Sequence, residues 1–250
     1  MKTGNKNLIQ QYNSKGWVKI KNLVSKKDIY KINYNLDKFL KKTIKKYKGR
    51  DINFATNNNK AKKYINSFHK LADSDLIRNG LAKKNNITKF ANYFLQNKSK
   101  FMASELFAKP AKYGLPSPVH QDNYYWCVKN SNALTIWIAL DKVSKSNGGV
   151  CYYEKSHRAG LLKHKPSYAK GSSQKIASKS ILAKFKKKFP SLNPGDALVH
   201  HCLTIHGSGK NKTNFSRRGL TLQFRAKNSS IDKMLKKNYE QQLKKQIKTR

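Results

Sequence analysis

The chain has 250 residues, and its 54 Lys and Arg against 12 Asp and Glu give a formal net charge of +42 at pH 7. This length can bury one substantial core, and 13 Tyr, 11 Phe and 3 Trp supply bulky side chains for it, which excludes an intrinsically disordered chain. The longest clearly apolar run, Ala133 to Leu140, is too short to cross a bilayer, so we expect no membrane span.

The first hundred residues are predicted to be mostly helical. Residues 17–20 (WVKI) indicate a short strand, and Ser25 with Asp28 three residues later forms a weak capping box before a helix. Apolar residues then recur on one helical face, at Ile29, Ile32, Leu36, Leu40 and Ile44. The polar stretch 53–59 is typical of a loop, and two further helices are expected over about 60–72 and 75–96.

From about residue 101 the pattern changes to short β-rich runs separated by turn residues. The runs are FMASELFA, ALTIWIAL, GVCYYE, DALVHH and LTLQFRA. Their spacing predicts an antiparallel barrel or jelly roll rather than βαβ units. Residues 161–190 form an insertion with a Lys-rich helical piece, and 229–250 form a basic helix or tail. We expect one α+β domain over 1–250, with its β core at 101–228.

The motif PVHQD, residues 118–122, lies between two of these β runs. If the segment is an extended strand, His120 and Asp122 project to the same face, so an imidazole nitrogen and a carboxylate oxygen converge. His206, on a later β-rich segment, is the candidate third ligand. Two His and one carboxylate are the donor set of non-haem iron(II) oxygenases, which leaves positions open for co-substrate and dioxygen.

A second block, PGDALVHHCLTIHGSGKNKTNFSRR, carries His206 and, 11 residues later, Arg217. A guanidinium at that position can hold a distant carboxylate by paired hydrogen bonds. A shift in strand register would make His200 or His201 the ligand instead of His206. Cys202 is interpreted as a buried strand residue rather than a nucleophile.

These blocks, together with KPAKYGLPSPVHQDNYYW and LTIWIALDKVSKSNGGVCYYEKSHRAGLLKH, resemble the phytanoyl-CoA dioxygenase family of iron(II)- and 2-oxoglutarate-dependent oxygenases. The resemblance covers roughly residues 105–225, and GWVKIKNLVSKKDI is similar to the start of the family's domain. It implies a double-stranded β-helix (a jelly-roll or cupin-like fold) with N-terminal and flanking helices. It also implies hydroxylation of a small metabolite. Fe(II) would be the bound metal, 2-oxoglutarate and O2 the co-substrates, and succinate and CO2 the products released.

The resemblance further implies roles for individual residues. It makes His120, Asp122 and His206 the iron ligands, and Arg217, with Ser208 beside it, the binder of the 2-oxoglutarate 5-carboxylate. Four more residues match positions that line the co-substrate pocket: Lys109, Gln121, Trp137 and His164. Halogenating relatives lack the carboxylate ligand, so the presence of Asp122 favours hydroxylation.

Alternation along residues 217–225 distinguishes Arg217 from Arg218. One face carries Arg217, Gly219, Thr221 and Gln223, and the other carries Arg218, Leu220, Leu222 and Phe224. We expect the apolar face to pack beneath the N-terminal helices and the polar face to look into the barrel. Gly219 and Thr221 would then leave space for a ligand.

The positive charge has two interpretations. It is typical of proteins that bind nucleic acid, but Lys supplies 47 of the basic residues and Arg, which recognises phosphate and guanine in a planar geometry, only 7. We therefore favour compositional drift and expect no specific nucleic-acid partner, although the charge leans toward an anionic substrate. A basic nucleic-acid-binding protein or a catalytically idle protein on the same scaffold remains the alternative.

The three cysteines, Cys127, Cys151 and Cys202, form no CxxC pair and no even framework. They are interpreted as reduced thiols, and the N-terminus shows no apolar secretory segment, so we expect a cytoplasmic protein. The sequence as a whole does not predict the oligomeric state.

Overall fold

The computed structural model describes residues 2–56, 63–81, 86–169 and 171–248. Its helices are α1 (Lys2–Lys15), α2 (Lys26–Thr43), α3 (Asn86–Leu95), α4 (Asn123–Trp126), α5 (Ser180–Ala183) and α6 (Lys233–Lys248), with a π-helical segment at Leu76–Leu81. Its strands are β1 (Trp17–Ile20), β2 (Ile52–Thr56), β3 (Lys63–Phe68), β4 (Ser99–Lys109), β5 (Ser117–His120), β6 (Ala133–Ala139), β7 (Val150–Tyr153), β8 (His164–Ala169), β9 (Ser172–Ile176), β10 (Lys187–Lys188), β11 (Ala197–His201), β12 (His206–Ser208) and β13 (Arg217–Ala226).

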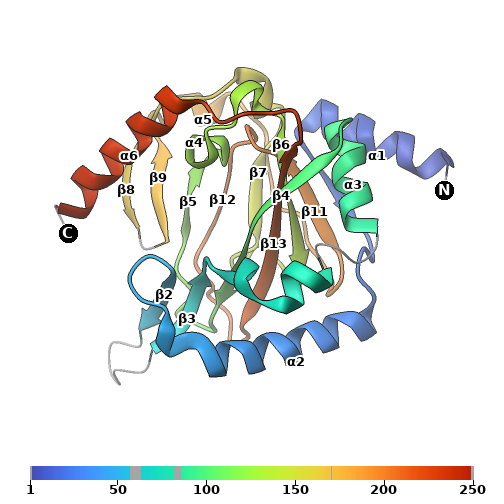
Figure 1. Cartoon of the computed structure of the whole chain (residues 1–250), viewed down its shortest axis with the longest axis vertical. Coiled ribbons are helices and arrows are strands. Elements are labelled where there is room, and N and C mark those ends of the chain that lie inside the picture. Colours follow the sequence, from blue (N-terminus) through green and yellow to red (C-terminus); the bar gives the residue numbers. More distant parts are fainter. Residues whose placement is uncertain (1, 57–62, 82–85, 170, 249–250) are drawn as a thin grey trace.

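The strands form a double-stranded β-helix made of two facing antiparallel sheets. The larger sheet has the order β1-β11-β6-β13-β4-β3-β2, and the smaller has the order β10-β7-β12-β5. Strands β8 and β9 form a separate hairpin, and α6 lies along it at the C-terminal end (Figure 1). The fold class predicted from the alternating β runs is confirmed.

Helices α1, α2 and α3 pack against the outer face of the larger sheet, and the strand alternation explains why. On β13 the side chains of Leu220, Leu222 and Phe224 enter a continuous core with apolar residues of α2 and α3. The opposite face of β13 carries Thr221 and Gln223, which line a cavity between the sheets. The predicted separation of the two faces of this strand is therefore confirmed.

The capping box and amphipathic pattern after residue 25 also predicted the structure correctly. The Ser25 hydroxyl accepts a hydrogen bond from the Asp28 amide at 3.1 Å and donates one to the Asp28 carboxylate at 2.7 Å. The helix α2 starts at Lys26, and its apolar face, Ile29, Ile32, Leu36 and Leu40, is buried. The short strand at 17–20 is observed as β1.

The helix expected over 60–72 is wrong where the structure describes it, because Lys63–Phe68 is strand β3. Strand β3 pairs with β2 and with β4, where Phe68 lies opposite Leu106, and Phe68 is fully buried. Burial of this strand in the sheet overrides the local helical pattern. The loop expected over 53–59 is also wrong as far as residue 56, which ends β2, and 57–62 lie outside the described residues.

Three other segments differ from expectation. The helix expected over 75–96 is found as Leu76–Leu81 and α3, and 82–85 lie outside the described residues. The insertion 161–190 is mainly the β8–β9 hairpin, and its Lys-rich end pairs with β7 as β10 instead of forming a helix. Helix α1 was not predicted, because its sequence is polar; Tyr12 anchors it by packing against Phe94 at 5.0 Å between ring centroids.

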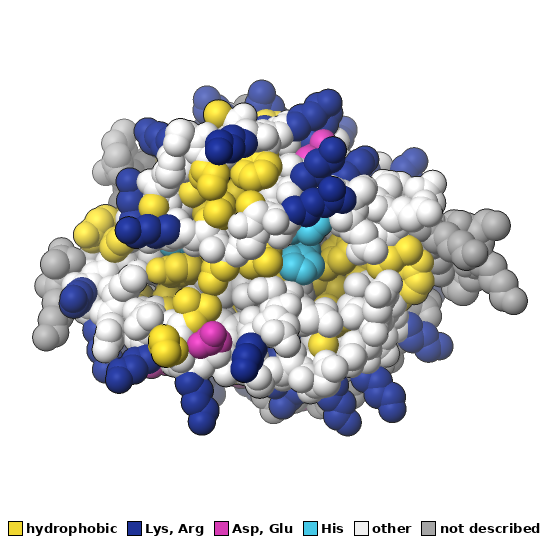
Figure 2. All heavy atoms as spheres, turned by 90° about the horizontal axis from the view of Figure 1, so that it is seen from above, with side chains coloured by type: hydrophobic (Ala, Val, Ile, Leu, Met, Phe, Trp, Pro, Cys, Tyr) yellow, Lys and Arg dark blue, Asp and Glu magenta, His cyan; other side chains and the backbone are white. Residues whose placement is uncertain are grey.

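Basic side chains are spread around the surface. Figure 2 shows Lys and Arg side chains over several parts of one face, with few acidic side chains among them and no single basic stripe. Among the described residues, no helix is both long enough and apolar enough to cross a membrane.

Candidate active site

The histidines and the aspartate of the two motifs meet inside the barrel. His120 ends β5 and lies opposite His206, the first residue of β12. The Nε2 atoms of both rings lie 3.5 Å from Oδ1 of Asp122, and the three candidate ligand atoms are all within 4.8 Å of one another.

Asp122 reaches this point from a different backbone conformation than expected. The strand ends at His120, and Asp122 has helical torsion angles (φ −58°, ψ −38°) immediately before α4. The argument from two alternate positions of one strand is therefore wrong, although the two side chains do converge. The turn into α4 brings the carboxylate back toward the histidine rings.

Backbone carbonyls fix the orientation of both imidazole rings. The Nδ1 atom of His120 lies 2.7 Å from the carbonyl oxygen of Pro118, and Nδ1 of His206 lies 2.9 Å from that of Thr204. A carbonyl oxygen can only accept, so Nδ1 carries the proton in each ring and Nε2 keeps its lone pair. Both lone pairs are therefore available at the point where Asp122 Oδ1 lies.

The charge states suit metal binding. Burial, with the neighbouring His120 and His200, lowers the pKa of His206 to about 3 although Asp122 opposes the shift, so the ring is neutral at pH 7. Burial alone would raise the pKa of Asp122, but the neighbouring His206 and the hydrogen bond that His200 donates lower it well below its usual value. A neutral imidazole and an ionised carboxylate are the forms that bind a cation.

The second oxygen of Asp122 is held from behind. Thr135 Oγ1 donates to Asp122 Oδ2 at 2.7 Å, and His200 Nε2 donates to the same atom at 3.0 Å. The Nδ1 atom of His200 accepts from the Tyr152 hydroxyl at 2.9 Å. His200 therefore supports the carboxylate, and His201 faces another way, toward Tyr12.

Arg217 lies fully buried against the indole ring of Trp137, with its guanidinium carbon 5.3 Å from the ring centroid. Its Nη2 donates to the carbonyl oxygen of Gly148, whereas Nε and Nη1 have no hydrogen-bond partner among the residues that the structure describes. Burial lowers the pKa of Arg217 to about 9, so the guanidinium is still charged at pH 7. A buried cation with unused donors is a candidate anchor for a carboxylate.

Lys109 lies opposite Arg217 in the β4–β13 register. Its Nζ donates to the carbonyl oxygens of Leu115 and Gly209, both at 2.6 Å. Burial, with the nearby charge of Arg217, lowers the pKa of Lys109 to about 6. The side chain lines the same cavity as Arg217, Trp137 and Ser208.

Two other predicted pocket residues do not reach the cavity. Gln121 is fully buried, and its amide donates to the carbonyl oxygens of Gly160 and Leu203. His164 Nε2 accepts a hydrogen bond from the backbone N–H of Gln121 at 3.1 Å, and the His164 ring stacks on Tyr124. Both side chains hold the loop that carries Asp122 and do not line the cavity.

The space beside Gly219 was expected to hold a ligand, and this is wrong. A Cβ atom built on Gly219 would lie 1.8 Å from Cζ2 of Trp137, so the indole ring fills that space. Glycine is needed here because the ring on which Arg217 rests passes directly over the backbone.

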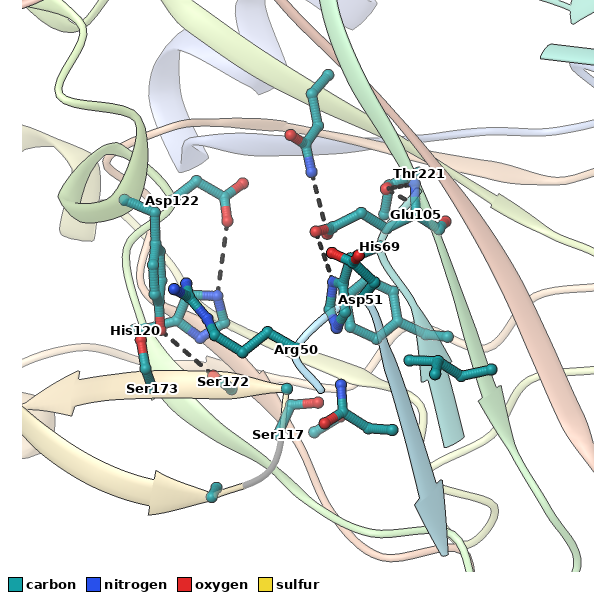
Figure 3. Close-up of a pocket in the computed structure, with 18 of the residues that line it drawn as sticks. Arg50, Asp51, His69, Glu105, Ser117, His120, Asp122, Ser172, Ser173 and Thr221 are labelled. Atoms are coloured by element: carbon teal, nitrogen blue, oxygen red, sulfur yellow. Dashed lines mark hydrogen bonds and ion pairs between the residues drawn. The ribbon is translucent and has the colours of Figure 1, made fainter. Parts of the chain in front are cut away.

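The cavity has a volume of about 1320 Å³, and the sequence did not point to much of its wall. The residues missed include His69, Glu105 and Thr135, and Tyr239 and Leu243 of α6. Alternation along β4 could have identified Glu105, because it lies four residues before Lys109 and so shares its face. His69 and the α6 residues give no such signal. Figure 3 shows His120 and Asp122 on one side of the cavity and His69 and Glu105 on the other.

Comparison with known proteins agrees with this geometry. The human peroxisomal phytanoyl-CoA dioxygenase (Homo sapiens) is 26% identical over 226 residues, which cover 85% of this chain and 66% of that protein, just under two thirds of its length. The structure of EctD from S. alaskensis with bound Fe superposes with a TM-score of 0.75 at 18% identity, over 91% of this chain and 78% of that one. The structure of the epimerase SnoN in complex with Fe3+, alpha ketoglutarate and nogalamycin RO superposes with a TM-score of 0.70 at 18% identity, over 91% of this chain and 86% of that one.

The family model for Phytanoyl-CoA dioxygenase (PhyH) matches residues 12–219. The match takes in His120, Asp122, His206 and the buried Arg217 within one continuous stretch that makes up most of the chain. The chain therefore belongs to the phytanoyl-CoA dioxygenase family.

Proposed function

We propose that this protein is an iron(II)- and 2-oxoglutarate-dependent dioxygenase that hydroxylates a small, anionic metabolite and releases succinate and CO2. The observation that carries the proposal is the pairing of two features in one cavity. The triad of His120, Asp122 and His206 gathers three ligand atoms, and Arg217 presents unpartnered guanidinium donors to the same space.

The donor set fits iron(II). Two imidazole nitrogens and one carboxylate oxygen form a facial triad, and three protein ligands leave open positions for a chelating co-substrate and dioxygen. His120 and His206 would hold the metal through Nε2, whose lone pairs are free because Nδ1 is committed to a carbonyl oxygen. Asp122 would bind through Oδ1 alone, since Thr135 and His200 occupy Oδ2.

Arg217 fits the distal carboxylate of 2-oxoglutarate. A buried guanidinium with two unpartnered nitrogens is destabilising unless an anion satisfies it, and a carboxylate matches its paired donors. The Trp137 ring covers one face of the guanidinium and excludes water from it. Lys109 lies opposite Arg217 and Ser208 lines the same cavity, so we assign both to co-substrate binding as well.

When bound, iron(II) and 2-oxoglutarate together supply the activation of dioxygen. The chain's own contribution is to hold the ligand atoms in place, to orient the co-substrate through Arg217, and to wall one side of the cavity with α6. The presence of Asp122 as a carboxylate ligand supports hydroxylation as the outcome. We further propose that the protein works in the cytoplasm, which its cysteines support: within the described residues all three are buried and free.

The test is an anaerobic titration of the iron(II)-loaded protein with 2-oxoglutarate, monitored by the visible charge-transfer absorption of the chelate. We expect the band to appear in the wild-type protein and to be absent from Asp122→Ala at the same metal concentration. If the wild-type protein binds iron(II) without developing this band at saturating 2-oxoglutarate, the proposed function is wrong.

A further inference from the structure

We propose that Glu105, His69 and Gln223 form a substrate-recognition site on the cavity wall opposite the triad, and that the substrate is a small anion that also carries a hydroxyl or amine donor. This inference rests on the proposed function and deepens it. It assigns the donor group of the substrate to the Glu105 carboxylate and the anionic group to a basic rim made of Lys48, Arg50 and Lys70.

The Glu105 carboxylate is held firmly but retains accepting capacity. His69 Nδ1 donates to Oε1 at 2.7 Å, and Gln223 Nε2 donates to Oε2 at 3.1 Å. An ionised carboxylate has about four lone-pair sites, so these two bonds leave others for a ligand. The Glu105 side chain is 24% exposed and the His69 side chain 17%, and both line the cavity (Figure 3).

His69 is itself positioned to keep this arrangement fixed. Its Nε2 lies 3.1 Å from the Ser67 hydroxyl, which accepts from Asn53 at 3.2 Å, and its ring lies edge-on to Phe107. Burial alone would lower the pKa of His69, but the Glu105 carboxylate raises it. The wall therefore presents a preorganised acceptor, and the Glu105 carboxylate favours the protonated form of the His69 ring.

The strand register places Glu105 at the same level of the barrel as the metal-facing carboxylate. Thr135, which donates to Asp122, lies directly opposite Gln223 in the β6–β13 pair. Gln223 in turn donates to Glu105. Side chains of directly paired residues are about 5 Å apart, so the register keeps Glu105 near the level of Asp122. Figure 3 shows the two carboxylates on opposite sides of the cavity.

Physical chemistry then selects the kind of substrate. A ligand that displaces water from this wall leaves the remaining lone pairs of Glu105 unpaired unless it supplies an N–H or O–H donor. The penalty for leaving such a group unsatisfied makes the site reject substrates that lack the donor. An apolar substrate surface at this position is therefore disfavoured.

The rim of the cavity favours an anion. Lys48, Arg50 and Lys70 line it beside Asp51, with Asp73 bonded to Tyr47 nearby, and Arg50 is exposed. At the inner end, the charges of the metal, Asp122, 2-oxoglutarate and Arg217 would cancel one another, so the three cations of the rim against these two aspartates leave the rim net positive. Figure 3 shows the Arg50 side chain extending from the side of Asp51 toward that of His120.

The experiment measures binding to the anaerobic protein loaded with iron(II) and 2-oxoglutarate, by calorimetry. The probes are pairs in which one member carries hydroxyl or ammonium donors that the other lacks: sn-glycerol 3-phosphate with propyl phosphate, 2-aminoethyl phosphate with ethyl phosphate, and 3-hydroxybutyrate with butyrate. We expect at least one donor-bearing member to bind roughly tenfold or more tightly than its partner, the scale of a hydrogen bond to a charged group. Failure of every donor-bearing probe to bind, or equal binding within every pair, would overturn the inference.

Variants locate the selectivity. Glu105→Met removes the acceptor, and Glu105→Gln keeps the shape of the side chain in case the first variant does not fold; both should reduce the discrimination within a pair to about threefold or less. Glu154→Gln makes the same change of charge outside the cavity and should keep the wild-type ratio. Arg50→Ala should weaken the binding of every anionic probe without altering the affinity ratio within a pair. Arg158→Ala, a change outside the cavity, should leave both the affinities and the ratio unchanged.

The same samples separate this inference from the proposed function. Glu105 does not contact Arg217, so 2-oxoglutarate should bind the Glu105 variants as it binds the wild type. Unchanged discrimination in both Glu105 variants, with 2-oxoglutarate binding intact, would refute only the recognition site. Absence of 2-oxoglutarate binding to the iron(II)-loaded wild-type protein would instead refute the proposed function.

Discussion

The imidazole of His200 lies directly behind Asp122, with its Nε2 atom 3.0 Å from the carboxylate Oδ2. The Tyr152 hydroxyl holds the other ring nitrogen at 2.9 Å, so the ring has one orientation and one tautomer. The carboxylate is thereby turned so that only Oδ1 faces His120 and His206. The order of this relay, Tyr152 to His200 to Asp122, makes His200 a positioning residue for the proposed metal site.

Replacement of His200 by Phe should weaken iron(II) binding by about 10- to 100-fold, because groups that orient a metal ligand typically have effects of this size. The Asp122 side chain would remain but lose one of the two donors to Oδ2. Equilibrium dialysis with iron(II) under anaerobic conditions measures the change. The control is His201→Phe, since His201 lies on the same strand but does not line the cavity; equal losses in both variants would contradict the assignment.

Asp122→Ala should reduce iron(II) affinity sharply and abolish hydroxylation while leaving the fold nearly intact. The reason is that Oδ1 is the sole carboxylate oxygen in the candidate donor set, and two imidazoles alone bind weakly. Far-UV circular dichroism checks the fold, and metal-dependent stabilisation against heat checks binding. Substrate turnover by wild-type protein stripped of iron with a chelator would show that the metal assignment is wrong.

Arg217→Ala should raise the 2-oxoglutarate requirement by one to several orders of magnitude, on the scale of about 2–5 kcal/mol for an unpaired buried charge. Without co-substrate, the same variant should be no less stable than wild type, because it removes a buried cation whose Nε and Nη1 have no partner among the described residues. The apparent affinity for 2-oxoglutarate, measured with saturating iron, tests the first expectation.

Arg218→Ala is the matched control for that measurement. Arg218 lies on the opposite face of β13, where it pairs with Asp37 at 2.9 Å and with Asp141 at 3.3 Å. It should change the 2-oxoglutarate requirement far less than Arg217→Ala. A larger effect from Arg218→Ala would mean that the inward and outward faces of this strand are exchanged in solution.

Lys109 should make stability depend on pH in the absence of ligands. Its pKa is lowered to about 6 in the folded protein, mainly by burial, whereas an unfolded lysine has a pKa near its usual value of about 10.4. Between these values the unfolded state binds more protons, so the stability of the wild type should rise with pH relative to Lys109→Met. The slope of this stability difference with pH should approach about 1.4 kcal/mol per pH unit between the two pKa values and fall to zero below the folded pKa. Urea unfolding from pH 5 to pH 9 measures it; a flat difference would contradict the shift.

Binding to duplex DNA should be weak, independent of sequence and nearly absent at physiological salt. The net charge of +42 attracts any polyanion at low salt, but the basic residues are mostly Lys, and the face in Figure 2 shows no single stripe of them. Fluorescence anisotropy with two unrelated duplexes at low and physiological salt tests this expectation. Tight preference for one duplex at physiological salt would favour the nucleic-acid-binding alternative.

The segments whose local pattern and final environment agree could be predicted from sequence. Strand β1, helix α2 with its Ser25 cap, and the two faces of β13 were all expected, because the period of the apolar residues matches the surface that each element buries. Strand β3 was not, because its place in the sheet depends on pairing with β4, whose residues lie about 40 positions further along the chain.

By itself, the sequence determined the chemistry available to this protein: an HxD motif, a later His206 and an arginine 11 residues beyond it, in a β-rich context. Only the tertiary structure decided how those groups are used. It turned Asp122 into the site from the start of α4, placed His200 behind it, filled the space at Gly219 with Trp137, and brought Glu105 to the opposite wall. The physical reason is that side-chain identity and spacing are local properties, whereas convergence of side chains depends on strand register and packing between segments that are far apart in the chain.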